Sequence, residues 1–338
     1  MEIVIPPAPP LLEDIQSGIE NLNRSDFDHE TLSIALHTLC HTRGEPKTTP
    51  HLSLIIKALA NHDVVCFLTQ AKRLVRVLNH IKALGGVVPE LHFIHRAAAS
   101  RVVDMLKAAP DLERVTLRYW FYRWDSLRNL LNPKTLKQFT LIKFDSLTTL
   151  NFLEECKNLT HFNVTDVKCS SWSSLADLQS LEHFGATKAG TIDLSSLANL
   201  KNLKSLSIDQ CQIQNWNSLK SLSSIEKFCT RCSGFIDVSL LGEMHCLKSL
   251  TIDLSPITDW TGLTELSSVE KLEVYGSGFS NTAILENMAC LKHLIISHCN
   301  VNNWSGLDKL SSLKTIEIYN CPSFEQSKLN RKLEIKTW

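Results

Sequence analysis

A short apolar phrase recurs along this 338-residue chain at nearly constant intervals. Examples are NLKSLSI, SIEKFCT and CLKSLTI, which align on the first residue of an apolar pair. The first two intervals are 24 residues, the third is 23, and the remaining seven are all 22. A fixed period of this length is the signature of a stacked repeat architecture. We call the aligned residue of each repeat its anchor: Leu91, Val115, Phe139, Phe162, Phe184, Leu206, Phe228, Leu250, Leu272, Leu294 and Ile316.

The spacing of apolar residues inside one repeat predicts its local structure. From Leu206 the next apolar residue is Ile208, and alternation with period two predicts a short strand with one buried face. The following apolar residues, Cys211 to Ile225, recur about every three positions, which predicts a tight, 3₁₀-like return segment. One such unit cannot bury its own apolar face. The sequence therefore predicts an α/β solenoid with a parallel sheet on its concave face and the returns outside.

These repeats resemble those of leucine-rich repeat proteins over about 230 residues. The 22-residue units are similar to those of the leucine-rich phosphatase-1 regulatory subunit and of the bacterial internalins. The resemblance implies a curved horseshoe with a protein-binding concave face. The turn position that usually holds Asn carries Cys or Ser in this chain, a variant that resembles the cysteine-bearing repeats of some kinetoplastid and F-box-type proteins. The residues at this position are Cys211, Ser233, Ser255, Ser277, Cys299 and Cys321.

The flanks of the repeat region differ from its centre. Residues 1–63 contain several amphipathic segments and are expected to form an N-terminal α-helical cap. Residues 64–321 are expected to hold about 11 to 12 repeats, beginning with a degenerate one anchored at Phe67 and with helical returns in the first ones. Residues 322–338, which include the strand-like segment KLEIKTW, are expected to cap the other end.

The sequence also has a longer period of 44 residues, which is twice the 22-residue repeat. Trp172, Trp216, Trp260 and Trp304 are spaced by this interval, which indicates that pairs of repeats were duplicated together. We expect each indole to fill the return layer and to donate its N–H to a neighbouring turn. An exposed tryptophan stripe with a functional role is the alternative.

Charge and cysteine content restrict the class of protein. The 35 basic residues balance 35 acidic ones, so the chain lacks the net positive charge typical of nucleic-acid binding, which is kept as a minor alternative. No apolar run is long enough to span a membrane, and no secretion signal is recognisable at the N-terminus. The 11 cysteines are scattered, which favours free thiols in a reducing compartment. We therefore expect a cytoplasmic protein, with the nucleus as the alternative.

Catalytic motifs are absent from the sequence. It contains no Gly-rich phosphate loop, no GxSxG and no HExxH. Cys229 and Cys232 form a CxxC pair, but a zinc site requires a second ligand pair and a redox site requires a helix N-terminus. We expect no enzyme, cofactor or metal site. A pathogen effector or cysteine-dependent enzyme is retained as an alternative, as is a component of a ribonucleoprotein.

The concave strand face is the predicted site for a protein partner. Toward the C-terminal end its outward positions combine aromatic and charged residues, a composition suited to a protein interface. The run from Arg118 to Trp124 has five aromatic residues of seven, although Trp120 is expected to pack in the core. The oligomeric state is left open. The candidate partner-binding residues are Arg118, Tyr119, Tyr122, Arg231, Lys271, Glu273, Tyr275 and Tyr319.

Overall fold

The computed structural model describes residues 2–4, 65–67, 90–93, 106, 112–118, 131–144, 147, 150–235, 237–324 and 334–337. The chain divides into two compact units, Met1–Leu147 and Thr148–Trp338. Each unit is built around parallel strands that are hydrogen-bonded in sequence order. The second unit contains the regular 22-residue repeats and most of the described residues.

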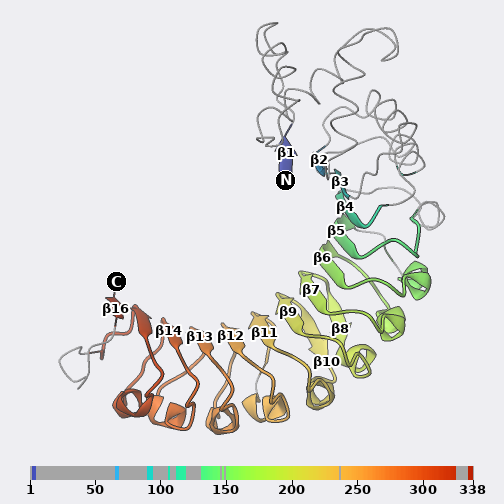
Figure 1. Cartoon of the computed structure of the whole chain (residues 1–338). Helices are drawn as coiled ribbons and strands as arrows, with labels where there is room; N and C mark the ends of the chain where they lie inside the picture. The colour runs from blue at the N-terminus through green and yellow to red at the C-terminus, as the bar shows by residue number, and fades with distance from the viewer. Residues whose placement is uncertain are drawn as a thin grey trace, which may run out of the picture. The chain divides into compact units, whose positions relative to one another are not determined.

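The strands of the second unit run side by side along the inner side of an arc (Figure 1). Each anchor pairs with the anchor of the next repeat, for example Leu250 with Leu272 and Leu272 with Leu294. The period therefore sets the strand register, as predicted. The strands are β6 (His161–Val167), β7 (His183–Thr187), β9 (Ser205–Asp209), β11 (Lys227–Arg231), β12 (Ser249–Asp253), β13 (Lys271–Tyr275), β14 (His293–Ser297), β15 (Thr315–Tyr319) and β16 (Glu334–Thr337).

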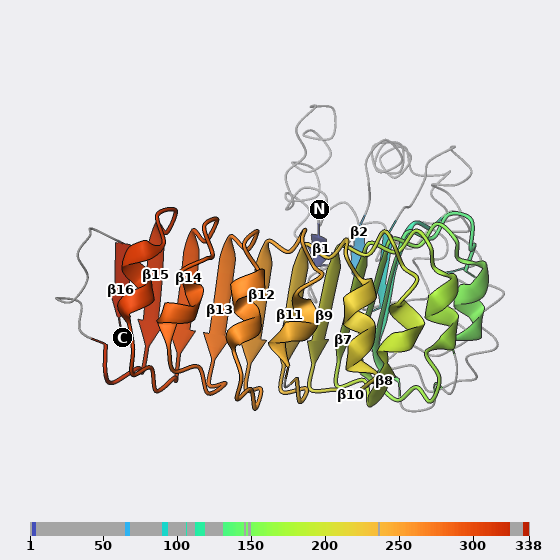
Figure 2. The same ribbon diagram turned by 90° about the horizontal axis from the view of Figure 1, so that it is seen from below.

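Short 3₁₀ turns form the returns of the second unit, and in Figure 2 they lie in front of its sheet, on the outer side of the arc. This confirms the reading of the three-residue apolar steps. Strands β8 (Thr191–Asp193) and β10 (Gln212–Gln214) form a separate parallel pair. The turns are η2 (Asn151–Glu155), η3 (Ser173–Asp177), η4 (Leu194–Leu197), η5 (Trp216–Ser221), η6 (Val238–Leu241), η7 (Thr261–Glu265), η8 (Thr282–Leu285) and η9 (Ser305–Lys309).

The core of the second unit lies between the sheet and the turns. Its anchors are almost fully buried, and the largest buried side chains include Phe162, Phe184 and Phe228. Burial of a large apolar side chain contributes roughly 1.5–3 kcal/mol, so this continuous column is the main source of stability. Each layer packs against its neighbours, so the strand register fixes the order of the outward side chains along the sheet.

The tryptophans spaced by 44 residues lie in the return layer, as expected. Trp172 is buried and its Nε1 donates to the carbonyl of Thr191 at 2.8 Å. Trp304 reaches the Ser323 hydroxyl at 3.5 Å. Trp260 is also buried, but its Nε1 has no hydrogen-bond partner among the described residues. The predicted indole donation is thus seen for two of these four residues in the described structure.

The first unit contains β1 (Glu2–Val4), β2 (Val65–Phe67), β3 (Glu90–Phe93), β4 (Arg114–Arg118) and β5 (Gln138–Phe144). Leu91 pairs with Val115, and Val115 pairs with Phe139, as the anchors predict. The degenerate repeat was predicted one residue out of register, because Cys66 rather than Phe67 pairs with Leu91.

The sequence analysis did not foresee β1, which pairs with β2. Apart from β1, the expected helical cap over residues 1–63 lies outside the described residues. Of the expected helical return between Leu91 and Val115, Leu106 is described, and it is α-helical and fully buried. The strand expected in KLEIKTW forms as β16, which pairs with β15.

Candidate functional site

On the inner face of the arc, one row of residues points outward, away from the core, and crosses the strands of the second unit. These residues lie three positions after each anchor, and the strand register pairs each with the next. We call this set the outward row. Its members in the second unit are Thr165, Thr187, Asp209, Arg231, Asp253, Tyr275, Ser297 and Tyr319.

Five predicted partner-binding residues come together on the inner face of β11 to β15. They are Arg231, Lys271, Glu273, Tyr275 and Tyr319. The other three belong to the first unit.

Arg118 is the last residue of β4 and pairs with Ile142, in the position that its spacing predicts. Its side chain, and the whole of Tyr119 and Tyr122, lie outside the described residues.

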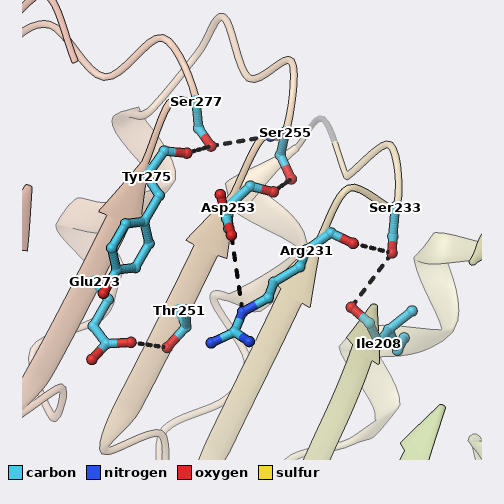
Figure 3. A network of polar contacts seen from close by, with 9 residues as sticks. All are labelled: Ile208, Arg231, Ser233, Thr251, Asp253, Ser255, Glu273, Tyr275 and Ser277. Atoms are coloured by element: carbon cyan, nitrogen blue, oxygen red, sulfur yellow. Dashed lines mark hydrogen bonds and ion pairs between the residues drawn. The ribbon is translucent and has the colours of Figure 1, made fainter. Parts of the chain in front are cut away.

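Arg231 lies between two carboxylates in the outward row. The register places Asp209 on one side and Asp253 on the other. Arg231 Nε is 4.0 Å from Asp253 Oδ2, within ion-pair range but beyond hydrogen-bond distance (Figure 3). The Asp253 side chain is only 26% exposed, and this burial raises its pKa despite the nearby guanidinium. Asp253 is therefore a partly desolvated carboxylate with weak pairing.

Glu273 is held more firmly than Asp253. Its Oε2 accepts a 2.8 Å hydrogen bond from Thr251 Oγ1, and its Oε1 is 2.6 Å from Lys271 Nζ. Its side chain is 13% exposed. The adjacent Tyr275 lies along the same strand toward Glu273 (Figure 3), and burial followed by the Glu273 charge raises the Tyr275 pKa. This part of the face is a fixed scaffold for an aromatic ring.

Glu317 forms a similar group at the C-terminal end of the row. It accepts a 2.7 Å hydrogen bond from the Tyr319 hydroxyl and a 3.1 Å contact from Lys336 Nζ. These two donors lower the Glu317 pKa. The sequence analysis missed Lys336, because no repeat spacing marked the final strand. A signal existed in the alternation of Glu334, Ile335 and Lys336, which follows the strand pattern of the repeats.

The residue after the outward row has a left-handed backbone in every complete repeat of the second unit. From Lys188 to His298 its N–H donates to the outward-row carbonyl of the next strand, as from Leu254 to Tyr275 at 2.8 Å. The fold imposes this conformation, which Gly, Asn and Asp adopt most readily. Leu254 is the unexpected member of the set, with φ of 45° and 60% exposure. The set consists of Asp166, Lys188, Gln210, Cys232, Leu254, Gly276, His298 and Asn320.

The cysteine residues do not form a reactive centre in the described structure. Burial is the largest cause of a raised pKa at both Cys229 and Cys232, so neither thiol is activated. Cys156, Cys211, Cys229, Cys232, Cys246, Cys290, Cys299 and Cys321 carry free thiols. Among the described residues, no group of three or more His, Cys, Asp or Glu side chains is arranged to hold a metal ion.

Comparison with solved structures identifies this architecture. The chain has a leucine-rich repeat fold like that of the internalins. It superimposes on an internalin (inlF) from Listeria monocytogenes with a TM-score of 0.58 and 21% identity, over 78% of this chain and 77% of that one. An internalin C2 from the same organism gives a TM-score of 0.40 and 20% identity, over 63% of this chain and 82% of that one.

The likeness to these solved structures concerns the fold. The sequence matches no protein-family model and no curated protein. Within the described parts of the chain, no helix has both the length and the apolar character that crossing a bilayer demands.

Proposed function

We propose that this chain is a non-catalytic scaffold or adaptor subunit that binds a protein partner on the inner face of β11 to β15. One observation carries the proposal: the strand register fixes Arg231, Asp253, Tyr275, Ser297 and Tyr319 as adjacent members of one row. A rigid row loses little conformational entropy when a partner binds.

The chemistry of the row favours a protein over a nucleic acid. Tyrosine and arginine are enriched at interface hot spots, because they bury much area and keep a polar group. Of the basic residues of this face, Arg231 and Lys271 lie beside Asp253 and Glu273, and Lys227 is exposed on β11. A phosphate-binding surface needs an excess of unpaired positive charge. The ribonucleoprotein alternative therefore has less support.

The remaining assignments extend this proposal. Arg118, Tyr119 and Tyr122 stay candidate contacts of the first unit. The raised pKa values of Cys229 and Cys232 weigh against the alternative of a cysteine-dependent enzyme or effector. A cytoplasmic location, with the nucleus as the alternative, is proposed from the scattered cysteines, and cell fractionation with an antibody to the native protein would test it.

Paired substitutions on the two sides of one sheet test the binding face. The partner is first recovered by native purification and identified by cross-linking to the full chain. Tyr275→Ala and Tyr319→Ala should then weaken binding by about 2 kcal/mol if they are hot spots, with little change in melting temperature. Leu250→Ala, at a fully buried anchor, should instead lower stability by about 2–5 kcal/mol. Unchanged affinity in both tyrosine variants would refute the assignment of this face.

A further inference from the structure

The only large apolar side chain that is exposed among the described residues is Leu254. It follows Asp253 directly and lies at the edge of the outward row, where the chain leaves β12. Its left-handed backbone is unfavourable for a leucine, and at 60% exposure little burial compensates for it. Six of the seven equivalent positions carry Asp, Lys, Gln, Gly, His or Asn, and the seventh is Cys232. Leu254 therefore has a cost that the repeat itself does not require.

The Leu254 side chain lies over the next repeat and forms one wall of a hollow. A Cβ atom on Gly276 would lie 2.8 Å from Leu254 Cδ2, so the leucine side chain lies over a glycine. A shallow hollow of about 350 Å³ opens beside it. Its lining combines apolar residues and glycines with three hydroxyl residues: Leu254, Pro256, Ile257, Gly276 and Gly278, with Ser255, Thr258 and Ser277. This hollow is large enough to take an apolar side chain from a partner.

Beside this hollow, the outward row has two carboxylates and only one guanidinium. Asp209 and Asp253 flank a single guanidinium, that of Arg231. The Asp253 side chain is partly buried, and its closest approach to Arg231 is the 4.0 Å pair, which is too long for a hydrogen bond. A cation from a partner could complete the pairing of Asp253, whereas an acidic group would meet two carboxylates. Charge complementarity thus favours a basic group at this position.

We infer that Asp253 and Leu254 form a recognition point within the binding face, and that they receive a protein segment carrying an Arg or Lys side chain next to an apolar one. The inference rests on the proposed function and specifies the chemistry of the partner. The basic side chain pairs with Asp253, and the apolar one enters the hollow beside Leu254. Asp253 and Leu254 are consecutive residues, whose Cα atoms are about 3.8 Å apart. The two partner side chains that contact them must therefore also be close to each other.

A displayed library of short random peptides, selected on the full chain, tests this inference. The enriched peptides should carry Arg or Lys beside a large apolar residue. Their affinity should fall roughly tenfold or more in Asp253→Asn and in Leu254→Asn, the loss typical of a hot spot. Binding should also weaken as salt rises, because the ion pair of Asp253 remains partly exposed and is screened.

Two matched variants serve as controls. Glu243→Gln removes an exposed carboxylate from a return segment, and Gln210→Asn changes an equivalent left-handed position in another repeat. Both should bind the peptides like the native chain. Because Asn accepts a left-handed backbone, Leu254→Asn should melt at the same or a higher temperature than the native chain while it loses binding.

The possible failures are distinguishable. An acidic consensus among the selected peptides would overturn the inference. So would equal affinity for the native chain and for Asp253→Asn or Leu254→Asn. It would also be overturned if no peptide preferred the native chain to a chain that carries both substitutions. Peptides that are insensitive to these two variants but lost in Tyr319→Ala would leave the proposed binding face intact. Peptides insensitive to all three variants would count against the proposed face as well.

Discussion

A short side chain with a hydroxyl or thiol closes the turn after β9 and after each of the strands β11 to β15. Ser277 is 1% exposed, and its hydroxyl donates to the Tyr275 carbonyl at 2.7 Å. The same oxygen accepts the N–H of Ser255 from the previous repeat at 3.0 Å. Cys299 donates in the same way to the Ser297 carbonyl at 3.3 Å. A hydroxyl or thiol is therefore sufficient at the position where related repeats carry asparagine.

The Ser277 hydroxyl is expected to be replaceable by a thiol but not by a methyl group. Ser277→Ala leaves the Ser255 N–H buried without an acceptor, which should lower the free energy of unfolding by about 1–3 kcal/mol. Ser277→Cys keeps a polar atom and should lose less. Urea denaturation of both variants measures the difference. Equal losses would show that cavity or volume effects, rather than the hydrogen bond, dominate at this turn.

Thiol labelling should follow exposure and thiolate content. Burial, followed by the Glu155 charge, raises the pKa of Cys156 to about 11. Its thiolate is thus scarce below that pH, and its labelling should accelerate only as the pH approaches 11 or the chain unfolds. The exposed Cys246 and Cys290 should react first.

Mass spectrometry of modified peptides over a pH series would give the order of labelling. Rapid labelling of Cys229 or Cys232 at mildly acidic pH would contradict their raised pKa values. That result would restore the alternative of a cysteine-dependent enzyme.

At the scale of elements, close glycine contacts hold successive returns together. A Cβ on Gly306 of η9 would lie 1.9 Å from the Thr282 carbonyl oxygen of η8. A Cβ on Gly262 of η7 would lie 2.5 Å from the backbone nitrogen of Ser239 in η6. Neither contact can relax by a side-chain rotation, because the opposing atoms belong to the backbone. These two pairs of returns are therefore packed at a distance that only glycine permits.

Gly306→Ala should destabilise the second unit by about 1–3 kcal/mol, since it overpacks a backbone contact. The control is Gly242→Ala, which caps η6 in a right-handed conformation. Its Cβ would meet its nearest atom, the Ser239 carbonyl oxygen, at 3.3 Å. The control should be close to neutral, because alanine also restricts the unfolded chain. Thermal and chemical denaturation give both values, and similar losses in the two variants would argue against the close contact.

The regular elements could be predicted because the anchors carry the register. Leu206, Phe228 and Leu250 lie opposite one another, as the 22-residue spacing requires. The final strand was harder to register. The phrase KLEI resembles KLEV at the start of β13, which would make Leu333 the anchor, whereas Ile335 pairs with Ile316.

The candidate site could be predicted only as a row of positions. Strand alternation places Arg231 and Tyr275 outward, and the register aligns them with Asp253. The sequence could not show that Arg231 stays 4.0 Å from Asp253, or that Leu254 lies over Gly276. These features depend on side-chain conformation and on turn geometry, which the apolar period does not encode.

For the long repeat region as a whole, the structural unit is a pair of repeats. Glu182, Glu226 and Glu270 each pair with a lysine of the next repeat, at 2.8–2.9 Å. The ring centroids of Trp216 and Phe235 are 5.0 Å apart, and those of Trp260 and Phe279 are 5.1 Å apart. Both patterns recur every 44 residues. Exposed ion pairs add little stability individually, but like charges on adjacent strands are unfavourable.

Deletion of one 44-residue pair should therefore be better tolerated than deletion of one repeat. Removing residues 205–248 joins Lys204 to Ser249, so Lys204 takes the place of Lys248 and the charge alternation continues toward Glu270. Removing residues 205–226 instead brings Lys204 beside Lys248 and deletes Trp216 from its contact with Phe235.

In a stack of nearest-neighbour contacts, stability reflects the quality of each interface as well as the number of repeats. If repeat number alone mattered, the shorter chain would be the less stable one. We expect the opposite order in urea denaturation, with circular dichroism confirming that both chains fold; a lower midpoint for the 44-residue deletion would contradict the pairwise unit.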